Sequence, residues 1–281
     1  MASRRHGVLT FFAFLQSFFY LVGFAVFQQV HADCLRPLST LGGLMLCGPT
    51  SCGKTALALE LAHRINGGLI NGDEMLYYRH LSVGIDLGSF PRSRTRLYEI
   101  FDPERPKISP PEHSAFVEQS VGELRMAGFF PIIQGTTFSY AKSVLELKNP
   151  PATLVVYREY DAKFAHDVRK RVEIEFENGF LDNVKTALTN GWDRTAYGFY
   201  GSYAYPTAAK AVRGEMSVKE AIDLISGAIV ETAVRQTEKY RALPGVEWLK
   251  YDSARKDELV DAILKRIQSG VGFSKTRTKS D

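Results

Sequence analysis

Apolar and polar positions along the chain form short apolar blocks separated by longer stretches with helical spacing. Five blocks have the length of buried strands, and they lie at Leu44–Cys47, Gly68–Asp73, Phe129–Gln134, Thr153–Tyr157 and Val246–Tyr251. Short runs that are apolar throughout are typical of strands covered on both faces. The pattern therefore predicts a central sheet.

Helical spacing separates these blocks. Apolar residues at Leu57, Leu61 and Ile65 recur every four positions, which places them on one face of a helix. Similar patterns predict four more helices, at Glu112–Ala127, Asp161–Asn178, Ser217–Arg241 and Ser253–Ile267. Strands that alternate with helices predict an α/β fold, in which a parallel sheet is flanked by helices.

The composition is that of a chain with a substantial core. Of the 281 residues, 45% are hydrophobic, and the net charge of +4 neither requires nor excludes a nucleic-acid partner. The three cysteines form no Cys-x-x-Cys pair, which favours a reducing compartment over a disulfide framework. Residues 86–111 are rich in Pro, Arg and Ser, and we expect a mobile loop over the site.

The N-terminal segment indicates a different environment. Residues 8–30 carry no charged side chain and follow Arg4 and Arg5, as in a signal peptide or a membrane anchor. The alternatives are an extension upstream of the real start and a buried extra helix, so the location of the protein stays open. An intracellular place is favoured for the domain that follows, with membrane contact only through residues 8–30 if that segment is retained. We separate residues 1–33 from a domain at 34–273 and a polar, disordered tail at 274–281.

One octet between the first strand and the following helix carries the clearest chemistry. It reads Gly48-Pro49-Thr50-Ser51-Cys52-Gly53-Lys54-Thr55 and fits the phosphate-binding pattern G-x-x-x-x-G-K-[ST]. Gly48 and Gly53 allow backbone conformations that a Cβ would block, and the backbone N–H groups then form an anion site that includes Ser51. Lys54 adds a positive charge and Thr55 a hydroxyl that can hold Mg²⁺. The octet, called the phosphate loop below, predicts a P-loop NTPase-like sheet.

An acidic residue follows the second predicted strand. Asp73 lies at the carboxyl end of that strand, and ligands of open α/β sheets bind at this edge. A carboxylate there can act as a general base or as a magnesium ligand. A solvated loop acid or a helix cap is the alternative.

The ordered motifs from Leu44 to Arg241 resemble the isopentenyltransferases. The phosphate loop and the helix after it look like the opening of that family, and Asp73-Glu74-Met75-Leu76-Tyr77-Tyr78-Arg79 resembles its second motif. The segment from Pro131 to Tyr140 is similar to the third motif. Further matches in the family's order are Lys170–Glu173 with Gly179, Thr195–Phe199, and Arg235-Gln236 with Tyr240-Arg241. The phosphate loop alone is shared by many NTPases, whereas the ordered set is far more specific.

Three departures from the family pattern stand out. Thr136 replaces the second glycine of the third motif, and Glu74 and Leu76 replace serine and glutamine in the second. The family's histidine pair is absent near Asp102-Pro103, where Arg96–Glu99 stands instead. Contacts that those family side chains make are therefore open in this chain.

The resemblance implies a dimethylallyl transferase. The phosphate loop and Mg²⁺ would then hold the prenyl diphosphate as a leaving group, and Thr50 would bind an oxygen near the reacting carbon. Asp73 would take the proton of the adenine N6 amine, and Arg235 would clamp the diphosphate. Tyr140 would contact phosphate or line the prenyl pocket.

The sequence also bears on which molecule accepts the dimethylallyl group. Members of the family that modify tRNA carry a helical insertion after the third motif, whereas here 20 residues separate Tyr140 from Asp161 and include a predicted strand. This favours AMP, ADP or ATP as acceptor, which would make a cytokinin precursor, over tRNA. A P-loop kinase that uses ATP, with Asp73 as base for a hydroxyl, and a nucleotide-binding module without catalysis are the rivals.

Overall fold

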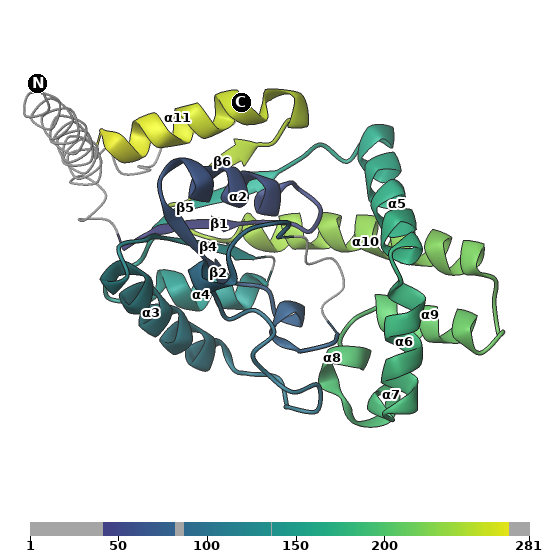
Figure 1. Ribbon diagram of the computed structural model, residues 1–281. Coiled ribbons are helices and arrows are strands. Elements are labelled where there is room, and N and C mark those ends of the chain that lie inside the picture. The colour runs from purple at the N-terminus through teal and green to yellow at the C-terminus, as the bar shows by residue number, and fades with distance from the viewer. Residues whose placement is uncertain (1–41, 82–86, 136, 270–281) are drawn as a thin grey trace, which may run out of the picture.

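The computed structural model describes residues 42–81, 87–135 and 137–269 (Figure 1). Its centre is one six-stranded sheet in the order β3-β2-β4-β1-β5-β6, in which every paired neighbour is parallel. The strands are β1 (Leu44–Cys47), β2 (Gly67–Asn71), β3 (Thr95–Arg96), β4 (Phe130–Gly135), β5 (Ala152–Tyr157) and β6 (Glu247–Lys250). The predicted parallel α/β sheet is confirmed, and its five predicted strands are all present.

Helices cover both faces of the sheet (Figure 1). The helices are α2 (Lys54–Arg64), α3 (Pro110–Met126), α4 (Phe138–Leu145), α5 (Ala162–Glu177), α6 (Phe180–Thr189), α7 (Trp192–Thr195), α8 (Tyr197–Tyr200), α9 (Ala204–Val212), α10 (Val218–Tyr240) and α11 (Lys256–Gln268). Helices α2 and α11 lie on one face, and α3, α4 and α10 lie on the other. Helices α5 to α9 form a lobe beside the sheet, joined to it by α10.

Side chains of β1 show how one strand serves two cores. Leu44 and Leu46 belong to the cluster beneath α2 and α11, whereas Met45 and Cys47 belong to the cluster beneath α3, α4 and α10. Successive side chains of a strand point to opposite faces, so a strand covered on both sides must be apolar throughout. This is why the run was recognisable in the sequence.

Helix α10 has a well-defined start. Ser217 accepts a hydrogen bond from the backbone N–H of Glu220, whose carboxylate accepts in return from the Ser217 N–H. This capping box satisfies two N–H groups of the first turn. The helix runs for 23 residues, from Val218 to Tyr240. Its last turns contact the phosphate loop through Gln236.

The segment predicted as a loop, residues 86–111, carries a short edge strand and the first residues of α3, which that prediction did not include. Thr95 and Arg96 form β3 and pair with β2. The guanidinium of Arg94 donates to the carbonyls of Gly67 and Ala62. The many Pro, Arg and Ser residues made the segment look polar, although some of its apolar side chains are buried, among them Leu97 and Tyr98.

Several sequence predictions fall outside the described residues. These are the segment 1–33 with its apolar stretch, Cys34, Thr136 and the tail 274–281. Within the described ranges, no helix has the length and apolar character that crossing a membrane demands.

Candidate active site

The phosphate loop takes the conformation that its glycines allow. Gly48 has φ +135°, and a Cβ there would lie 2.3 Å from the carbonyl oxygen of Val156. Gly53 has φ +84°, and a Cβ there would lie 2.3 Å from the ring of Tyr251. Both positions therefore exclude a side chain, which confirms why the pattern requires glycine there.

Lys54 is the first residue of α2, and its side chain is almost completely buried behind the loop. Its ammonium donates to the carbonyl of Pro49. Burial lowers the pKa of Lys54, and the neighbouring Asp73 carboxylate partly opposes this effect. A buried cation is costly unless an anion faces it, so the loop is suited to a negatively charged ligand.

Two amide side chains connect the loop to the rest of the site. The Thr55 hydroxyl donates to Gln134 Oε1 at 3.2 Å, and Gln134 Nε2 donates to the hydroxyl of Tyr98 at 2.8 Å. On the other side of the loop, the backbone N–H of Thr50 donates to Gln236 Oε1 at 2.7 Å. Gln134 comes from β4 and Gln236 from α10, so the loop is held from both its flanks.

Asp73 is positioned where the carboxyl ends of the neighbouring strands β2 and β4 approach each other closely. The N–H of Gly72 donates to the carbonyl of Gln134 at 2.7 Å, and a Cβ on Gly135 would lie 2.0 Å from the carbonyl carbon of Gly72. Buried Asn71 accepts from the Asp73 N–H at 2.8 Å. Asp73 Oδ1 accepts from the Met75 N–H at 3.0 Å.

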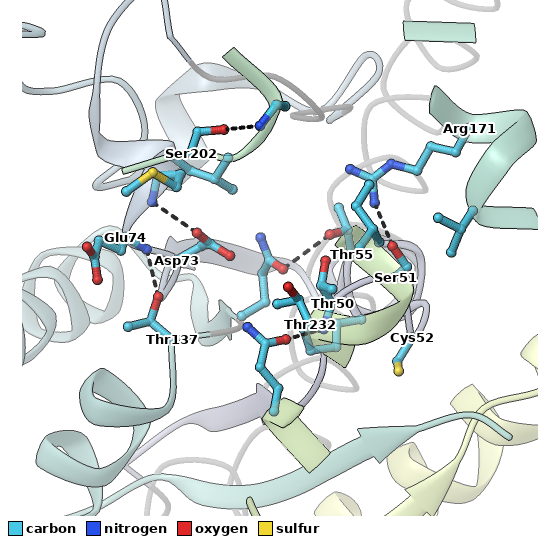
Figure 2. A pocket seen from close by; sticks show the side chains of 18 of the residues that line it. Thr50, Ser51, Cys52, Thr55, Asp73, Glu74, Thr137, Arg171, Ser202 and Thr232 are labelled. Atoms are coloured by element: carbon cyan, nitrogen blue, oxygen red, sulfur yellow. Dashed lines mark hydrogen bonds between the residues drawn. The ribbon is translucent and has the colours of Figure 1, made fainter. Parts of the chain in front are cut away.

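A cleft of about 890 Å³ joins these two parts of the chain. Figure 2 shows Asp73 facing the same space as Thr50 and Thr55. The charged residues that line it are Lys54, Asp73, Glu74, Lys107, Arg158, Asp167, Arg171, Glu175 and Lys239. Apolar side chains also line it, among them Met75, Leu76, Phe138, Val168, Ile225 and Ile229. The cleft can therefore take an anionic group and an apolar group side by side.

Most of the predicted site residues meet in this cleft. Thr50, Ser51, Gly53, Lys54, Thr55 and Asp73 all line it, and Gly48 forms the turn beneath them. Tyr140 does not reach it. Its ring lies in the core, stacked on His113 with ring centroids 4.2 Å apart, and its hydroxyl donates to the carbonyl of Ile108 at 3.0 Å.

Arg235 is also set apart from the cleft lining. Its side chain is 65% exposed and lies 3.5 Å from Glu231, one turn earlier on α10. It also donates to the hydroxyl of Thr232 at 2.9 Å. Thr232 and Gln236, on the adjoining face of α10, do line the cleft.

Glu74 forms contacts with other segments that the sequence did not predict. Its carboxylate accepts from the hydroxyl of Tyr197 and lies 2.6 Å from the ammonium of Lys107. Its backbone N–H donates to the hydroxyl of Thr137 at 2.9 Å. The glutamate that replaces the family serine thus ties three segments together, and its side chain points away from Asp73 (Figure 2).

Arg171 and Gln236 are two of the cleft residues to which the sequence analysis gave no site role. Both stand in motifs that matched the family's order, but no local pattern showed that they face the phosphate loop. The spacing of Thr232, Gln236 and Lys239 on one helix face was the available indication. It becomes informative only when the packing of α10 is known.

Cys52 occupies one of the variable positions of the phosphate-loop pattern. It belongs to the lining of the cleft but is fully buried, and burial raises the pKa of its thiol. Reactive cysteines are exposed thiolates. Cys52 therefore has the surroundings of an inert side chain.

The oxygen groups at the loop fit a magnesium ion that is shared with a ligand. Thr55 offers a hydroxyl, with the Gln134 amide oxygen hydrogen-bonded to it and the Asp73 carboxylate lining the same cleft. Among the residues that the structure describes, no group of three or more His, Cys, Asp or Glu side chains could form a cage for a metal. Mg²⁺ is usually held by one or two protein groups together with phosphate oxygens, so the donor set suits this mode.

Similar proteins share one activity in their names. The chain is 26% identical to a tRNA dimethylallyltransferase of Syntrophobacter fumaroxidans, over 85% of this chain and 92% of the relative. It is 21% identical to the tRNA dimethylallyltransferase of Acetivibrio thermocellus, over 82% of this chain and 98% of the relative. No protein-family model matches the chain.

Solved structures show the same fold. The full-length tRNA isopentenylpyrophosphate transferase of Bacillus halodurans superposes with a TM-score of 0.67 at 18% identity, covering 81% of this chain and 97% of that one. A eukaryotic dimethylallyltransferase acting on tRNA gives a TM-score of 0.64 at 13% identity, covering 84% of this chain and 81% of that one. These structures show the fold, and the sequence relatives show that the chain is similar to tRNA dimethylallyltransferases.

Proposed function

We propose that the protein transfers a dimethylallyl group from dimethylallyl diphosphate to the N6 amine of an adenine. The observation that carries this proposal is the meeting of the phosphate loop and Asp73 in one cleft, beside an apolar wall. The loop suits the diphosphate, the wall suits the prenyl chain, and the carboxylate suits the amine.

The reaction forms a bond between the allylic carbon and N6 and breaks the bond between that carbon and the diphosphate oxygen. Lys54 and the loop N–H groups stabilise the charge that grows on the leaving diphosphate. Thr55 would hold Mg²⁺, which would supply positive charge beside the leaving diphosphate. Asp73 accepts the N6 proton. An exocyclic aromatic amine is a weak nucleophile, so orientation in the cleft contributes as well.

Thr50 keeps its proposed role beside the donor. Its backbone is fixed by Gln236, and its side chain lies in the cleft next to Thr55 (Figure 2). The clamp role of Arg235 rests on the family resemblance alone, because this side chain is exposed and paired on its own helix. The phosphate-contact role of Tyr140 has no support from its buried position.

The names of the relatives favour tRNA as the acceptor. This runs against the expectation from the sequence, which ranked AMP, ADP or ATP above tRNA. The observation that keeps a free nucleotide as the second candidate is the short connection after the third motif, where α4 ends at Leu145 and β5 begins at Ala152. We propose tRNA first and the adenine nucleotide second.

Mass spectrometry of the reaction products tests both acceptors. The full chain is mixed with dimethylallyl diphosphate, Mg²⁺ and either unmodified tRNA or AMP, ADP or ATP. A dimethylallyl adduct on adenosine supports the proposal and identifies the acceptor. Transfer of phosphate from ATP to a third substrate indicates the rival kinase, and binding without any product indicates a module without catalysis.

A further inference from the structure

Glu74 lies beyond Asp73, on the side away from the phosphate loop (Figure 2). Its Oε1 accepts a hydrogen bond from the hydroxyl of Tyr197, and its Oε2 lies 2.6 Å from the ammonium of Lys107. The Glu74 side chain is only 12% exposed, so each oxygen of a largely buried carboxylate has its own partner. Glu74, Lys107 and Tyr197 are called the Glu74 cluster below.

The members of the Glu74 cluster come from three parts of the fold. Glu74 directly precedes the short 3₁₀ helix Met75–Tyr77, and Tyr197 is the first residue of α8. Lys107 lies in the segment between β3 and α3, and its ammonium is also 5.9 Å from the centre of the Tyr197 ring. One carboxylate therefore joins the turn after Asp73 to the lobe and to the segment before α3.

Helix α8 packs closely against the turn that follows Asp73. A Cβ on Gly198 would lie 2.8 Å from Cγ of Tyr78, and a Cβ on Gly201 would lie 3.2 Å from Cε of Met75. The two glycines let the helix approach the turn with no side chain in between. Because packed atoms transmit displacements, the position of α8 and the position of the turn depend on each other.

The same turn holds Asp73. The Met75 N–H donates to Asp73 Oδ1 at 3.0 Å, and the Glu74 N–H donates to the hydroxyl of Thr137 at 2.9 Å. Glu74 stands between Asp73 and Met75 in the chain, and it is fixed through both its backbone and its carboxylate. Loss of the carboxylate would release the turn on the α8 side while the backbone bond to Thr137 remains.

This arrangement depends on a glutamate at position 74. The serine of the family pattern has a side chain two bonds shorter and a single hydroxyl, so from the same backbone position it could not reach both Tyr197 and Lys107. The Glu74 cluster is therefore a consequence of a residue in which this chain departs from the pattern.

We propose that Glu74 is a positioning residue for Asp73: by anchoring Tyr197 and Lys107 to the turn after Asp73, it keeps that carboxylate directed into the cleft. Glu74 acts through Asp73 rather than on the reacting atoms. The inference rests on the proposed function in one respect, since it takes the placement of Asp73 to limit turnover.

Steady-state kinetics of the full chain test this role, with dimethylallyl diphosphate, Mg²⁺ and whichever acceptor the wild type prenylates, tRNA or an adenine nucleotide. Glu74→Ser should lower kcat about tenfold or more, because a small misplacement of a reacting group has an effect of that size. Calorimetry with inorganic diphosphate and Mg²⁺ should show binding near the wild-type value. Glu74→Gln should restore part of kcat, because its amide oxygen can still accept from Tyr197. Wild-type kcat in Glu74→Ser, or an equal loss of diphosphate binding, would overturn the proposal.

A double variant isolates the link between Glu74 and α8. Tyr197→Phe removes the hydroxyl that donates to Glu74, so adding it to Glu74→Ser should cause no further loss of kcat. Tyr200→Phe is the matched control, because Tyr200 lies on the same helix with 54% exposure and should keep the wild-type kcat. Additive losses in the double variant would show that the two residues act independently, against the proposal.

Hydrogen exchange of the peptide that covers residues 73–78 gives a readout that needs no turnover. Exchange should be faster in Glu74→Ser and Tyr197→Phe than in the wild type, and unchanged in Tyr200→Phe. If exchange follows this pattern but no acceptor is prenylated, the proposed function fails and the positioning of the turn by Glu74 stands. If the wild type prenylates an acceptor but exchange in Glu74→Ser is unchanged, the positioning role fails and the proposed function stands.

Discussion

The two ends of the cleft are built in different ways. At the phosphate-loop end, eight consecutive residues form the proposed anion site, because two glycines set the backbone and Lys54 follows them directly. At the Asp73 end, the position of one carboxylate depends on residues from β2, β4 and the loop between them. The first end is a local structure and the second is a tertiary one.

This difference has a chemical side. Backbone N–H groups and a buried ammonium recognise charge and tolerate many ligands, as the wide use of such loops indicates. A carboxylate at a fixed place selects the group that must lose a proton. We therefore expect changes at the Asp73 end to affect turnover, and changes at the loop end to affect both turnover and diphosphate binding.

The largest effect is expected at Asp73. Asp73→Asn removes the proton acceptor but keeps Oδ1, which accepts from the Met75 N–H, so the loop should stay in place. We expect kcat to fall by about 10²- to 10⁴-fold, the usual contribution of a general base. Steady-state rates measure this loss, and calorimetry with diphosphate should show binding near the wild-type value. A variant with wild-type rates would remove Asp73 from the mechanism.

The second-largest effect is expected at Lys54. Lys54→Met replaces the buried ammonium with an apolar chain of similar length, and we expect activity to fall by about 10²- to 10³-fold. Diphosphate binding should fall as well, in contrast to Asp73→Asn.

The same variant offers a stability readout. Burial lowers the pKa of Lys54. When no anionic ligand is bound, burying the charged ammonium therefore costs folding free energy. Thermal unfolding of the ligand-free variant should therefore show no loss of stability. A large loss would mean that Lys54 supports the fold rather than the ligand.

A smaller effect is expected at Gln236. Gln236→Leu leaves the Thr50 N–H without its acceptor, and kcat should fall about tenfold, the effect of one buried hydrogen bond. Glu238→Gln is the matched control, because this exposed side chain on the same helix pairs only locally with Arg241. Equal rates in the two variants would contradict a role for Gln236 in placing Thr50.

No effect is expected from thiol reagents. Burial raises the pKa of Cys47 to about 12 and also raises that of Cys52, so neither thiol should form a reactive thiolate near pH 8. A Cys34→Ser variant treated with a chromogenic disulfide should release no product until it is unfolded. Rapid labelling of the folded protein, with loss of diphosphate binding, would show that Cys52 is accessible.

Residues whose role is set by their neighbours along the chain could be predicted. The apolar run at Leu44–Cys47 and the glycines of the phosphate loop are such cases, because strand burial and positive φ follow local rules. Asp73 was found because a strand end is recognisable and parallel strands end at one edge of the sheet. The edge strand β3 was missed, because two residues in a polar segment carry too little pattern.

Residues whose role depends on helix packing could not be predicted in the same way. Tyr140 stands beside the third motif, but the packing of α3 against α4 encloses it in the core. Arg235 and Gln236 are adjacent in the sequence, yet one is exposed and the other holds the loop. A helix turns each successive side chain to a different direction, so the docking of α10 alone decides which of the two faces the site.

The sequence by itself thus determined the parallel α/β fold, the loop conformation at Gly48–Thr55 and the place of the Asp73 carboxylate at a strand end. The tertiary structure decided that Gln236 and Arg171 contact the phosphate loop and that Glu74 joins Tyr197 and Lys107. The physical reason is the range of the interactions involved. Backbone conformation and strand burial are written in a few consecutive residues, whereas contacts between distant helices and loops exist only once the chain has packed.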